Sequence, residues 1–335
     1  MISSGDKKNG TLVIQPLPGI GDVVWHLPHL KAIAGRSRDR RITLLTKQRT
    51  LAREVLAGTD FVREVLYLEP DGGRHDGPLG GWRLGADLAE HAFEEIWILH
   101  HSVRYALAAC KAGIKERIGY GIGWQDAFLT SPHSLSRRER QLSAIDKASR
   151  LLVLHDLNPV SLRPELQLTD EALAVAKTIF ASVPKPRAGL LIGSSEVVKQ
   201  WGESNFAALI ENMRLEKDQP IVLIGGASEQ GMADSLANRF GRPSWLILAI
   251  DKPILAAAAV AASCEVCIGN DTGMLNVAAA AGTKSIGLFG ASQPITRDDR
   301  IIAVLPESKR HRNKNQMANI TVDSVMRSLV NLDSG

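Results

Sequence analysis

Short apolar runs alternate with segments of helical periodicity along this 335-residue chain, and the alternation occurs in two series. Strands that alternate with helices form parallel sheets covered on both faces, and ligands bind beyond the carboxyl ends of such strands. The sequence therefore predicts an α/β fold with two facing Rossmann-like domains, residues 1–170 and 171–335, and a central cleft. The first series predicts strands at 11–15, 41–46, 62–68 and 95–99 and helices at 22–34, 48–57 and 103–112. The second predicts strands at 188–192, 220–225, 244–249, 265–269 and 285–289 and helices at 205–213, 229–240, 254–262 and 321–332.

The remaining composition narrows the class of protein. No run approaches the eighteen apolar residues of a membrane span, and the polar start MISSGDKKNG lacks the apolar core of a secretory signal, so we expect a cytoplasmic protein. Residues 1–150 contain 22 Lys/Arg and 17 Asp/Glu, which indicates either an anionic partner there or an ordinary solvated surface. These cations are spread out without interleaved aromatics, so nucleic acid is not expected. Cys264 and Cys267 lie in an apolar run and are interpreted as core residues rather than a redox or metal pair.

The loop after the first predicted strand, LPGIGDVVWHLP at 17–28, carries a carboxylate where glycine-rich loops usually bind phosphate. Asp22 allows two interpretations. It can cap the helix that follows. It can also act as a general base, because Gly19 and Gly21 let a second molecule approach closely. The local pattern leaves both open.

In the second series, GSSEVVKQW at 193–201 follows a predicted strand. Ser194 and Ser195 offer hydroxyl groups, and Lys199 offers a point charge suited to a diphosphate. The alternative interpretation is a solvated loop lysine.

GNDTGMLN at 269–276 opens an alanine-rich helix, with Asp271 and Thr272 as candidate N-caps. The backbone N–H groups of Thr272 and Gly273 would favour a phosphate at this helix end, although a plain capped helix explains the pattern as well. Glu229 follows a Gly-Gly turn, where it is either a favourable charge at a helix start or a ligand for ribose hydroxyls.

Together these segments resemble glycosyltransferase family 9, the heptosyltransferases of lipopolysaccharide core assembly. The resemblance covers nearly the whole chain. It is carried, in order, by LPGIGDVVWHLPHLKAI, RITLLTKQRTLAREVLAGTDFVREVLYL, KERIGY, KQWGESNFAALI and GNDTGMLNVAAAAGTKSIGLFGASQP.

The resemblance implies a GT-B type fold and an inverting, metal-independent transfer without a cofactor. The sugar would come from a nucleotide-diphosphate donor, ADP-heptose, and pass to a saccharide or glycolipid acceptor such as the lipopolysaccharide core. The donor would bind the C-terminal domain and the acceptor the N-terminal domain. Carried over by position, Asp22 becomes the catalytic base. The donor-binding residues would be Ser194, Ser195, Lys199, Glu229, Asp271, Thr272, Gly273 and Asn276.

Two departures from the family pattern keep alternatives open. Asn276 stands where the family usually has histidine, and the glycine-rich loop 70–85 has Arg74 and Arg83 as its only full cations, although related enzymes use a basic loop there to bind anionic sugars. The acceptor is therefore open between the lipopolysaccharide core, a different core sugar, an exopolysaccharide intermediate and a small aglycone, and a different donor is a further alternative. A non-catalytic binder and an epimerase on the same scaffold are the alternative classes.

The acceptor side is predicted from position alone. Gly21, His101 and Arg104 lie near predicted strand ends of the N-terminal domain and are the expected acceptor contacts. The basic run SKRHRNK at 308–314 is either a solvated surface or a peripheral contact with the cytoplasmic face of the inner membrane.

Overall fold

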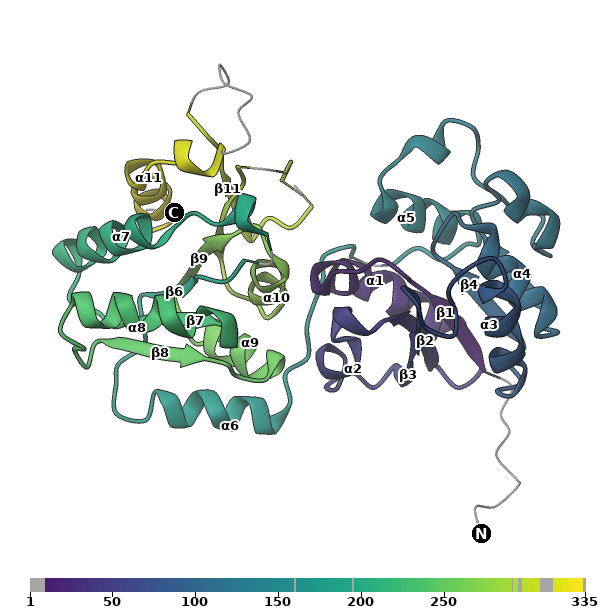
Figure 1. Cartoon of the computed structure of the whole chain (residues 1–335), viewed down its shortest axis with the longest axis horizontal. Coiled ribbons are helices and arrows are strands. Elements are labelled where there is room, and N and C mark those ends of the chain that lie inside the picture. The colour runs from purple at the N-terminus through teal and green to yellow at the C-terminus, as the bar shows by residue number, and fades with distance from the viewer. Residues whose placement is uncertain are drawn as a thin grey trace, which may run out of the picture. The chain divides into compact units, whose positions relative to one another are not determined.

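The computed structural model describes residues 10–159, 161–194, 196–290, 292–294, 297–307 and 316–333. The chain divides into two compact units, residues 1–164 and 165–335. Each unit contains one parallel sheet covered by helices (Figure 1). No helix among the described residues is both long and apolar enough to cross a membrane.

Unit 1 contains a five-stranded sheet in the order β3-β2-β1-β4-β5, and every pairing is parallel. The chain reverses its direction of winding between β1 and β4, so the loops after these two strands meet at the carboxyl edge of the sheet. The strands are β1 (Thr11–Ile14), β2 (Ile42–Lys47), β3 (Val62–Leu68), β4 (Glu95–Ile98) and β5 (Glu116–Gly119). The helices are α1 (Ile20–Arg36), α2 (Ala52–Val55), α3 (Gly80–Ala89), α4 (Val103–Lys111) and α5 (Ala144–Leu154).

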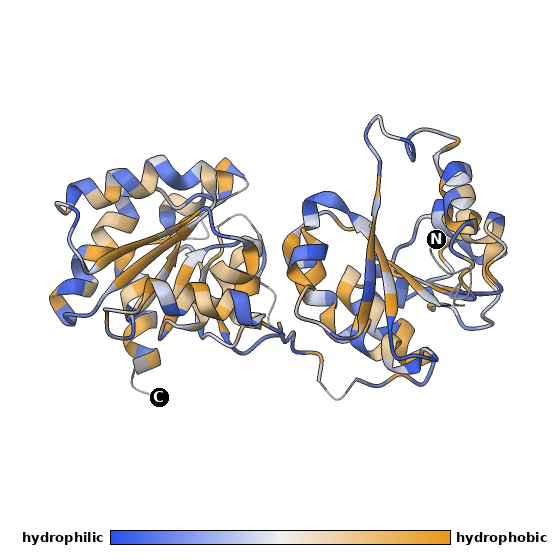
Figure 2. Cartoon of the chain, turned by 90° about the horizontal axis from the view of Figure 1, so that it is seen from below, coloured by the Kyte–Doolittle hydropathy of each residue, from blue (hydrophilic) through white to orange (hydrophobic). Residues whose placement is uncertain are grey.

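The central strands β1 and β4 of unit 1 are buried along their whole length and consist mostly of apolar residues, because both faces of the sheet are covered there. On one face, Leu12 and Ile14 of β1 pack with Leu84 of α3 and Ala108 of α4 in a single cluster. On the opposite face α1 packs against α5 and α2. In Figure 2 the strands of the unit that carries the C-terminus are coloured mainly as hydrophobic.

Unit 2 contains a six-stranded parallel sheet in the order β11-β10-β9-β6-β7-β8. Its change of winding direction falls between β6 and β9. The strands are β6 (Ala188–Leu191), β7 (Ile221–Gly225), β8 (Leu246–Ile250), β9 (Val266–Asn270), β10 (Ser285–Leu288) and β11 (Ile301–Val304). The helices are α6 (Asp170–Ile179), α7 (Glu203–Glu216), α8 (Gln230–Arg239), α9 (Ile254–Ala262), α10 (Gly273–Ala280) and α11 (Val322–Asp333).

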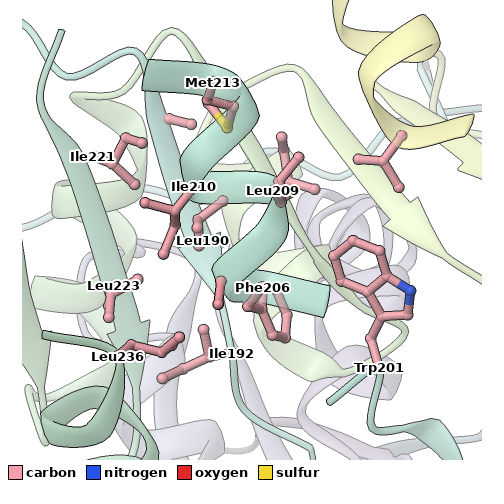
Figure 3. Close-up of a cluster of buried hydrophobic side chains, with 14 of the residues drawn as sticks. Leu190, Ile192, Trp201, Phe206, Leu209, Ile210, Met213, Ile221, Leu223 and Leu236 are labelled. Atoms are coloured by element: carbon pink, nitrogen blue, oxygen red, sulfur yellow. The ribbon is translucent and has the colours of Figure 1, made fainter. Parts of the chain in front are cut away.

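The core of unit 2 lies between the sheet and α7. Phe206, Ile210 and Met213 recur at helical spacing on α7 and face Leu190 of β6 and Ile221 of β7 (Figure 3). The indole of Trp201 packs edge-on against Phe206, with ring centroids 5.2 Å apart. This anchor fixes the start of α7 directly after the loop that carries Lys199.

Several sequence predictions are corrected by the structure. The glycine-rich loop predicted at 70–85 ends earlier, because α3 begins at Gly80. The single helix predicted at 48–57 is a 3-10 turn, Gln48–Thr50, followed by the short α2. Strands β5 and β11 were not predicted, because each is an edge strand in which only part of the residues is buried. The pattern also gave no signal for α5 and α6, of which only a few residues are buried.

Candidate functional site

The predicted site residues lie at the carboxyl edge of each sheet, where the winding direction changes. In unit 1, Asp22 follows β1 and His101 follows β4. In unit 2, Lys199 follows β6, Glu229 follows β7 and Asp271 follows β9. This is the edge at which open parallel sheets bind ligands.

Asp22 occupies the first turn of α1 and is partly buried. Its Oδ2 accepts a hydrogen bond from the backbone N–H of Gly19 at 2.8 Å. The carboxylate thus provides an acceptor for the N–H group of the residue that caps α1. A Cβ at Gly19 would lie 2.9 Å from Asp22 Oδ2, which explains a glycine at that position. A carboxylate accepts several hydrogen bonds, and capping therefore leaves acceptor capacity for a substrate hydroxyl.

A buried polar layer lies beneath Asp22. His26, one helical turn later, is fully buried, and its Nδ1 lies 2.6 Å from the carbonyl oxygen of Asp22. Burial lowers the pKa of His26, which keeps the ring neutral, with Nδ1–H as the donor to that carbonyl. Gln15 approaches the same ring from the end of β1 and accepts a hydrogen bond from Thr46 of β2 at 3.3 Å. The layer joins α1 to the first two strands of the sheet.

His100 and His101 form a stacked pair after β4, with ring centroids 4.3 Å apart. Nδ1 of His100 accepts the backbone N–H of Ser102 at 3.0 Å. Burial, together with the charges of His101, Lys47 and Lys147, lowers the pKa of His100 to about 4. Lys47 and Lys147 therefore lie near enough to act electrostatically on His100.

Arg104 has a different environment from the one predicted. Its guanidinium donates hydrogen bonds to the carbonyl oxygens of His75 and Gly77, both at 3.2 Å. His75 is itself buried and bonds Asp87 at 3.0 Å. Arg104 thus holds the loop between β3 and α3 in place, and its acceptor-binding role stays a prediction.

Lys199 ends a 3-10 turn and is about one-quarter exposed. Its Nζ lies 3.0 Å from Oε1 of Glu196 and 3.8 Å from Oδ2 of Asp271. Asp271 also accepts a hydrogen bond from the hydroxyl of Ser292. The hydroxyl of Ser194 donates to the carbonyl oxygen of Glu196 at 2.7 Å. The loops after β6 and β9 therefore bring the Lys199 ammonium together with two carboxylates, those of Glu196 and Asp271.

The start of α10 completes this group. Thr272 is its N-cap residue, and within the described part of the chain no side chain caps this helix end. The first N–H groups of a helix lack intrahelical partners and attract anions. Asn276 donates a hydrogen bond to the carbonyl oxygen of Thr272 at 3.3 Å, one turn back along α10.

Glu229 turns back on its own loop. Its Oε2 accepts the backbone N–H of Gly226 at 2.9 Å, and its Oε1 accepts the hydroxyl of Ser228 at 2.8 Å. A Cβ at Gly193 would lie 3.4 Å from Oε2, so the loops after β6 and β7 are neighbours. These contacts show the Glu229 carboxylate bound to groups at the start of the helical segment. Its role as a ligand for ribose hydroxyls stays a prediction.

Several residues around the site were missed by sequence reasoning. Lys47 ends β2, a strand adjacent to β1. Because ligands bind beyond the carboxyl ends of parallel strands, a search at the end of every predicted strand would have found it. Lys147 lies on α5, which reaches the site through its packing on α1, and the sequence carried no signal for that contact. Glu196, Ser292 and the buried Asn270 were also missed.

Two predicted features lie outside the described residues, namely Ser195 and the basic run at 308–314. In the part of the chain that is described, no group of three or more His, Cys, Asp or Glu side chains is placed to hold a metal ion. Cys264 and Cys267 are buried free thiols.

Comparison with solved structures places this fold. The structure of Escherichia coli ADP-heptose lipopolysaccharide heptosyltransferase II matches with a TM-score of 0.72 and 21% identity, covering 97% of this chain and 100% of that one. A family 9 glycosyltransferase from Veillonella parvula matches with a TM-score of 0.75 and 19% identity, covering 98% of both chains. An E. coli heptosyltransferase solved with ADP-2-deoxy-2-fluoro heptose gives 0.67 at 15% identity, covering 96% of this chain and 99% of that one. An iron-containing dodecameric glycosyltransferase from enterotoxigenic E. coli gives 0.56 at 13% identity, covering 98% and 77%.

The fold is that of a GT-B type glycosyltransferase with two Rossmann-like domains, as expected from the sequence. Glycosyltransferase family 9 (heptosyltransferase) matches residues 81–320, which is more than half of the sequence, and the chain belongs to this family. Lipopolysaccharide heptosyltransferase 2 of Salmonella typhimurium is 25% identical over 223 residues, and that of E. coli K12 is 24% identical. The match covers 63% of this chain and 64% of each relative, less than two thirds of their length.

Proposed function

We propose that this protein is an inverting, metal-independent glycosyltransferase that moves a heptose from ADP-heptose to a saccharide acceptor. The observation that carries the proposal is the group at the carboxyl edge of unit 2, where Lys199, Asp271 and the N-terminus of α10 lie together. A cation beside a helix N-terminus suits a diphosphate, and Asp271 suits the hydroxyl groups of the donor sugar. The relative solved with an ADP-heptose analogue supports this choice of donor.

In the proposed reaction Asp22 accepts the proton of the acceptor hydroxyl as its oxygen attacks the anomeric carbon of the donor. The bond from that carbon to the diphosphate oxygen breaks, and the negative charge remains on the diphosphate. Lys199 and the amides of Thr272 and Gly273 stabilise this charge, which is the task a metal ion performs in other transferases. Glu229 binds the ribose, and Ser194, Ser195 and Asn276 contact the donor.

The acceptor is proposed to be an anionic saccharide such as the lipopolysaccharide core. The position of Lys47 supports this proposal, because it ends β2 and places a positive charge at the same sheet edge as Asp22, which follows the adjacent β1. The loop between β3 and α3 contributes little, since Arg74 is paired with Asp87 at 2.6 Å. Gly21 and His101 lie at this edge and are the proposed acceptor contacts.

Binding of nucleoside diphosphates tests the proposal. Calorimetry with ADP, GDP and UDP should give the tightest binding with ADP, and Lys199→Ala should weaken it about tenfold or more, as expected for a charge-assisted contact of about 1.4 kcal/mol or more. Lys185→Ala is the matched control, because Lys185 is an exposed lysine that precedes the opposite end of β6. Turnover should survive a strong chelator of divalent and ferric ions. Wild-type protein that binds none of the three nucleotides would contradict the proposed donor, and loss of turnover with the chelator would contradict metal independence.

A further inference from the structure

A buried amide joins the two loops that form the candidate donor site. Asn270, the last residue of β9, has no exposed surface. Its Oδ1 accepts the backbone N–H of Trp201 at 3.1 Å. Its Nδ2 donates toward three oxygens, namely the carbonyls of Ile192 at 3.3 Å and Gly193 at 3.1 Å and the side-chain oxygen of Gln200 at 3.0 Å. One side chain thus binds both ends of the 192–201 loop.

Gln200 supplies a second, interlocking amide. Its Nε2 donates to the carbonyl oxygen of Ile192 at 3.0 Å, and its Oε1 accepts the N–H of Gly202 at 3.3 Å as well as Nδ2 of Asn270. The two amides therefore share Ile192 as a common acceptor. The next residue, Trp201, is buried in the hydrophobic core (Figure 3). Its indole N–H donates a hydrogen bond to the carbonyl oxygen of Ile320 at 2.8 Å.

The middle of the same loop has little packing to hold it. Val197 is 93% exposed and Val198 is 44% exposed, so apolar burial contributes little between the two ends. Lys199 directly precedes Gln200, Ser194 directly follows Gly193, and Asp271 directly follows Asn270. The residues proposed to contact the diphosphate and the donor sugar are therefore sequence neighbours of the hydrogen-bonded ends.

We propose that Asn270 and Gln200 form an amide clamp that positions Lys199 and Ser194 relative to Asp271 and the start of α10. The proposal rests on the donor site put forward above. The clamp residues are positioning residues, because they act through the loop. Precise placement matters at such a site, since misplacement of a binding group by about 1 Å is enough to lose most of its benefit.

The chemistry of position 270 requires an amide. Only one orientation of the Asn270 side chain matches its partners, with oxygen toward an N–H donor and nitrogen toward three oxygens. A carboxylate there would place a buried negative oxygen against those three oxygens. A leucine would leave buried backbone groups without partners. The two neighbouring residues thus differ in role. Asn270 is buried and binds the 192–201 loop, whereas Asp271 is partly exposed and lies beside Lys199.

The test compares Gln200→Ala and Asn270→Ala with a matched control in the full-length protein. Asn205→Ala is the control, because Asn205 donates a similar side-chain hydrogen bond, at 2.7 Å to the carbonyl oxygen of Trp201, but does not touch the 192–200 segment through it. ADP affinity is measured by calorimetry at a temperature where urea titration shows each variant to be folded. Hydrogen exchange of residues 193–199 is measured on the same samples.

Both clamp variants should weaken ADP binding about tenfold or more and accelerate exchange of residues 193–199, whereas Asn205→Ala should leave both unchanged. The double variant should lose little more than either single variant, because both remove the same clamp. If Asn270→Ala fails to fold, Gln200→Ala decides alone, since Gln200 is only partly buried. Wild-type affinity in folded clamp variants, or an equal loss in Asn205→Ala, would overturn the clamp. Absence of nucleotide binding by the wild type would overturn the proposed function as well.

Discussion

At the scale of single residues, Glu196 is the counter-ion that the donor diphosphate would have to displace. Its carboxylate lies 3.0 Å from Nζ of Lys199 and is about half exposed, and its backbone carbonyl accepts the hydroxyl of Ser194. The ammonium of Lys199 and the hydroxyl of Ser194, both proposed to bind the donor, thus have Glu196 as their partner. Under the proposed function, Glu196 would compete with the donor for Lys199.

Substitution Glu196→Gln should tighten ADP binding about 1.4- to 5-fold at low ionic strength, because an exposed ion pair contributes about 0.2–1 kcal/mol. Calorimetry at two salt concentrations checks this, and the gain should shrink at the higher one. Glu211→Gln is the control, since Glu211 pairs with Arg239 at 3.0 Å in the same unit. Unchanged or weaker ADP binding in Glu196→Gln would show that Glu196 does not compete.

Buried histidines give the protein a defined pH dependence. Burial lowers the pKa of His26, and it is also the main cause that lowers the pKa of His100 to about 4. An unfolded histidine titrates near pH 6.5, so below that pH the unfolded state binds more protons than the folded state. The contribution of these neutral histidines to stability should therefore be complete above pH 6.5. The free energy of unfolding should fall as the pH drops from 6.5 toward 4.

Urea titrations from pH 8 to pH 4 measure this dependence. His100→Gln should flatten the part of the slope that ends near pH 4. Asp87 does not account for this window, because hydrogen bonding to Arg74 lowers its pKa to about 2, which places its own loss of stability at more acidic pH. A free energy of unfolding that is constant between pH 6.5 and 4 would contradict the neutral, buried state of these rings.

At the scale of elements, the loop between β3 and α3 is a packed structure. Arg104 of α4 donates to the carbonyls of His75 and Gly77, and a Cβ at Gly80 would lie 2.1 Å from the carbonyl oxygen of His75. Loops as long as 70–85 are usually functional or mobile, and the sequence does not reveal that an arginine from a later helix binds this one. Close approach is the reason for glycine at position 80.

Arg104→Ala should lower the free energy of unfolding by about 1–3 kcal/mol, because two partly buried carbonyls lose charged donors. Urea titration gives the stability, and steady-state kinetics give the KM for the acceptor. A structural role predicts a loss of stability with little change in that KM. A large rise in the acceptor KM at unchanged stability would instead assign Arg104 to the acceptor.

At the scale of the whole molecule, the two-unit fold could be predicted from the repeated strand–helix alternation. Buried parallel strands consist of short apolar runs, which can be recognised locally in the sequence. The placement of Asp22, Lys199 and Asp271 at strand ends followed from the same pattern. Contacts such as Asn270 with Ile192, or Arg104 with His75, join residues that are far apart in sequence. No local pattern encodes them, so the partners that position the site became visible only in the folded chain.

The proposed division of labour assigns the base to unit 1 and the donor to unit 2. Asp22→Asn tests it most directly, because asparagine retains an oxygen that can accept the N–H of Gly19 while losing the ability to take a proton. The turnover number with ADP-heptose and the dissociation constant of ADP are measured on the same preparation. The turnover number should fall about 10²- to 10⁴-fold, and the dissociation constant of ADP should stay within about twofold. Turnover close to that of the wild type would contradict the assignment of Asp22 as the catalytic base.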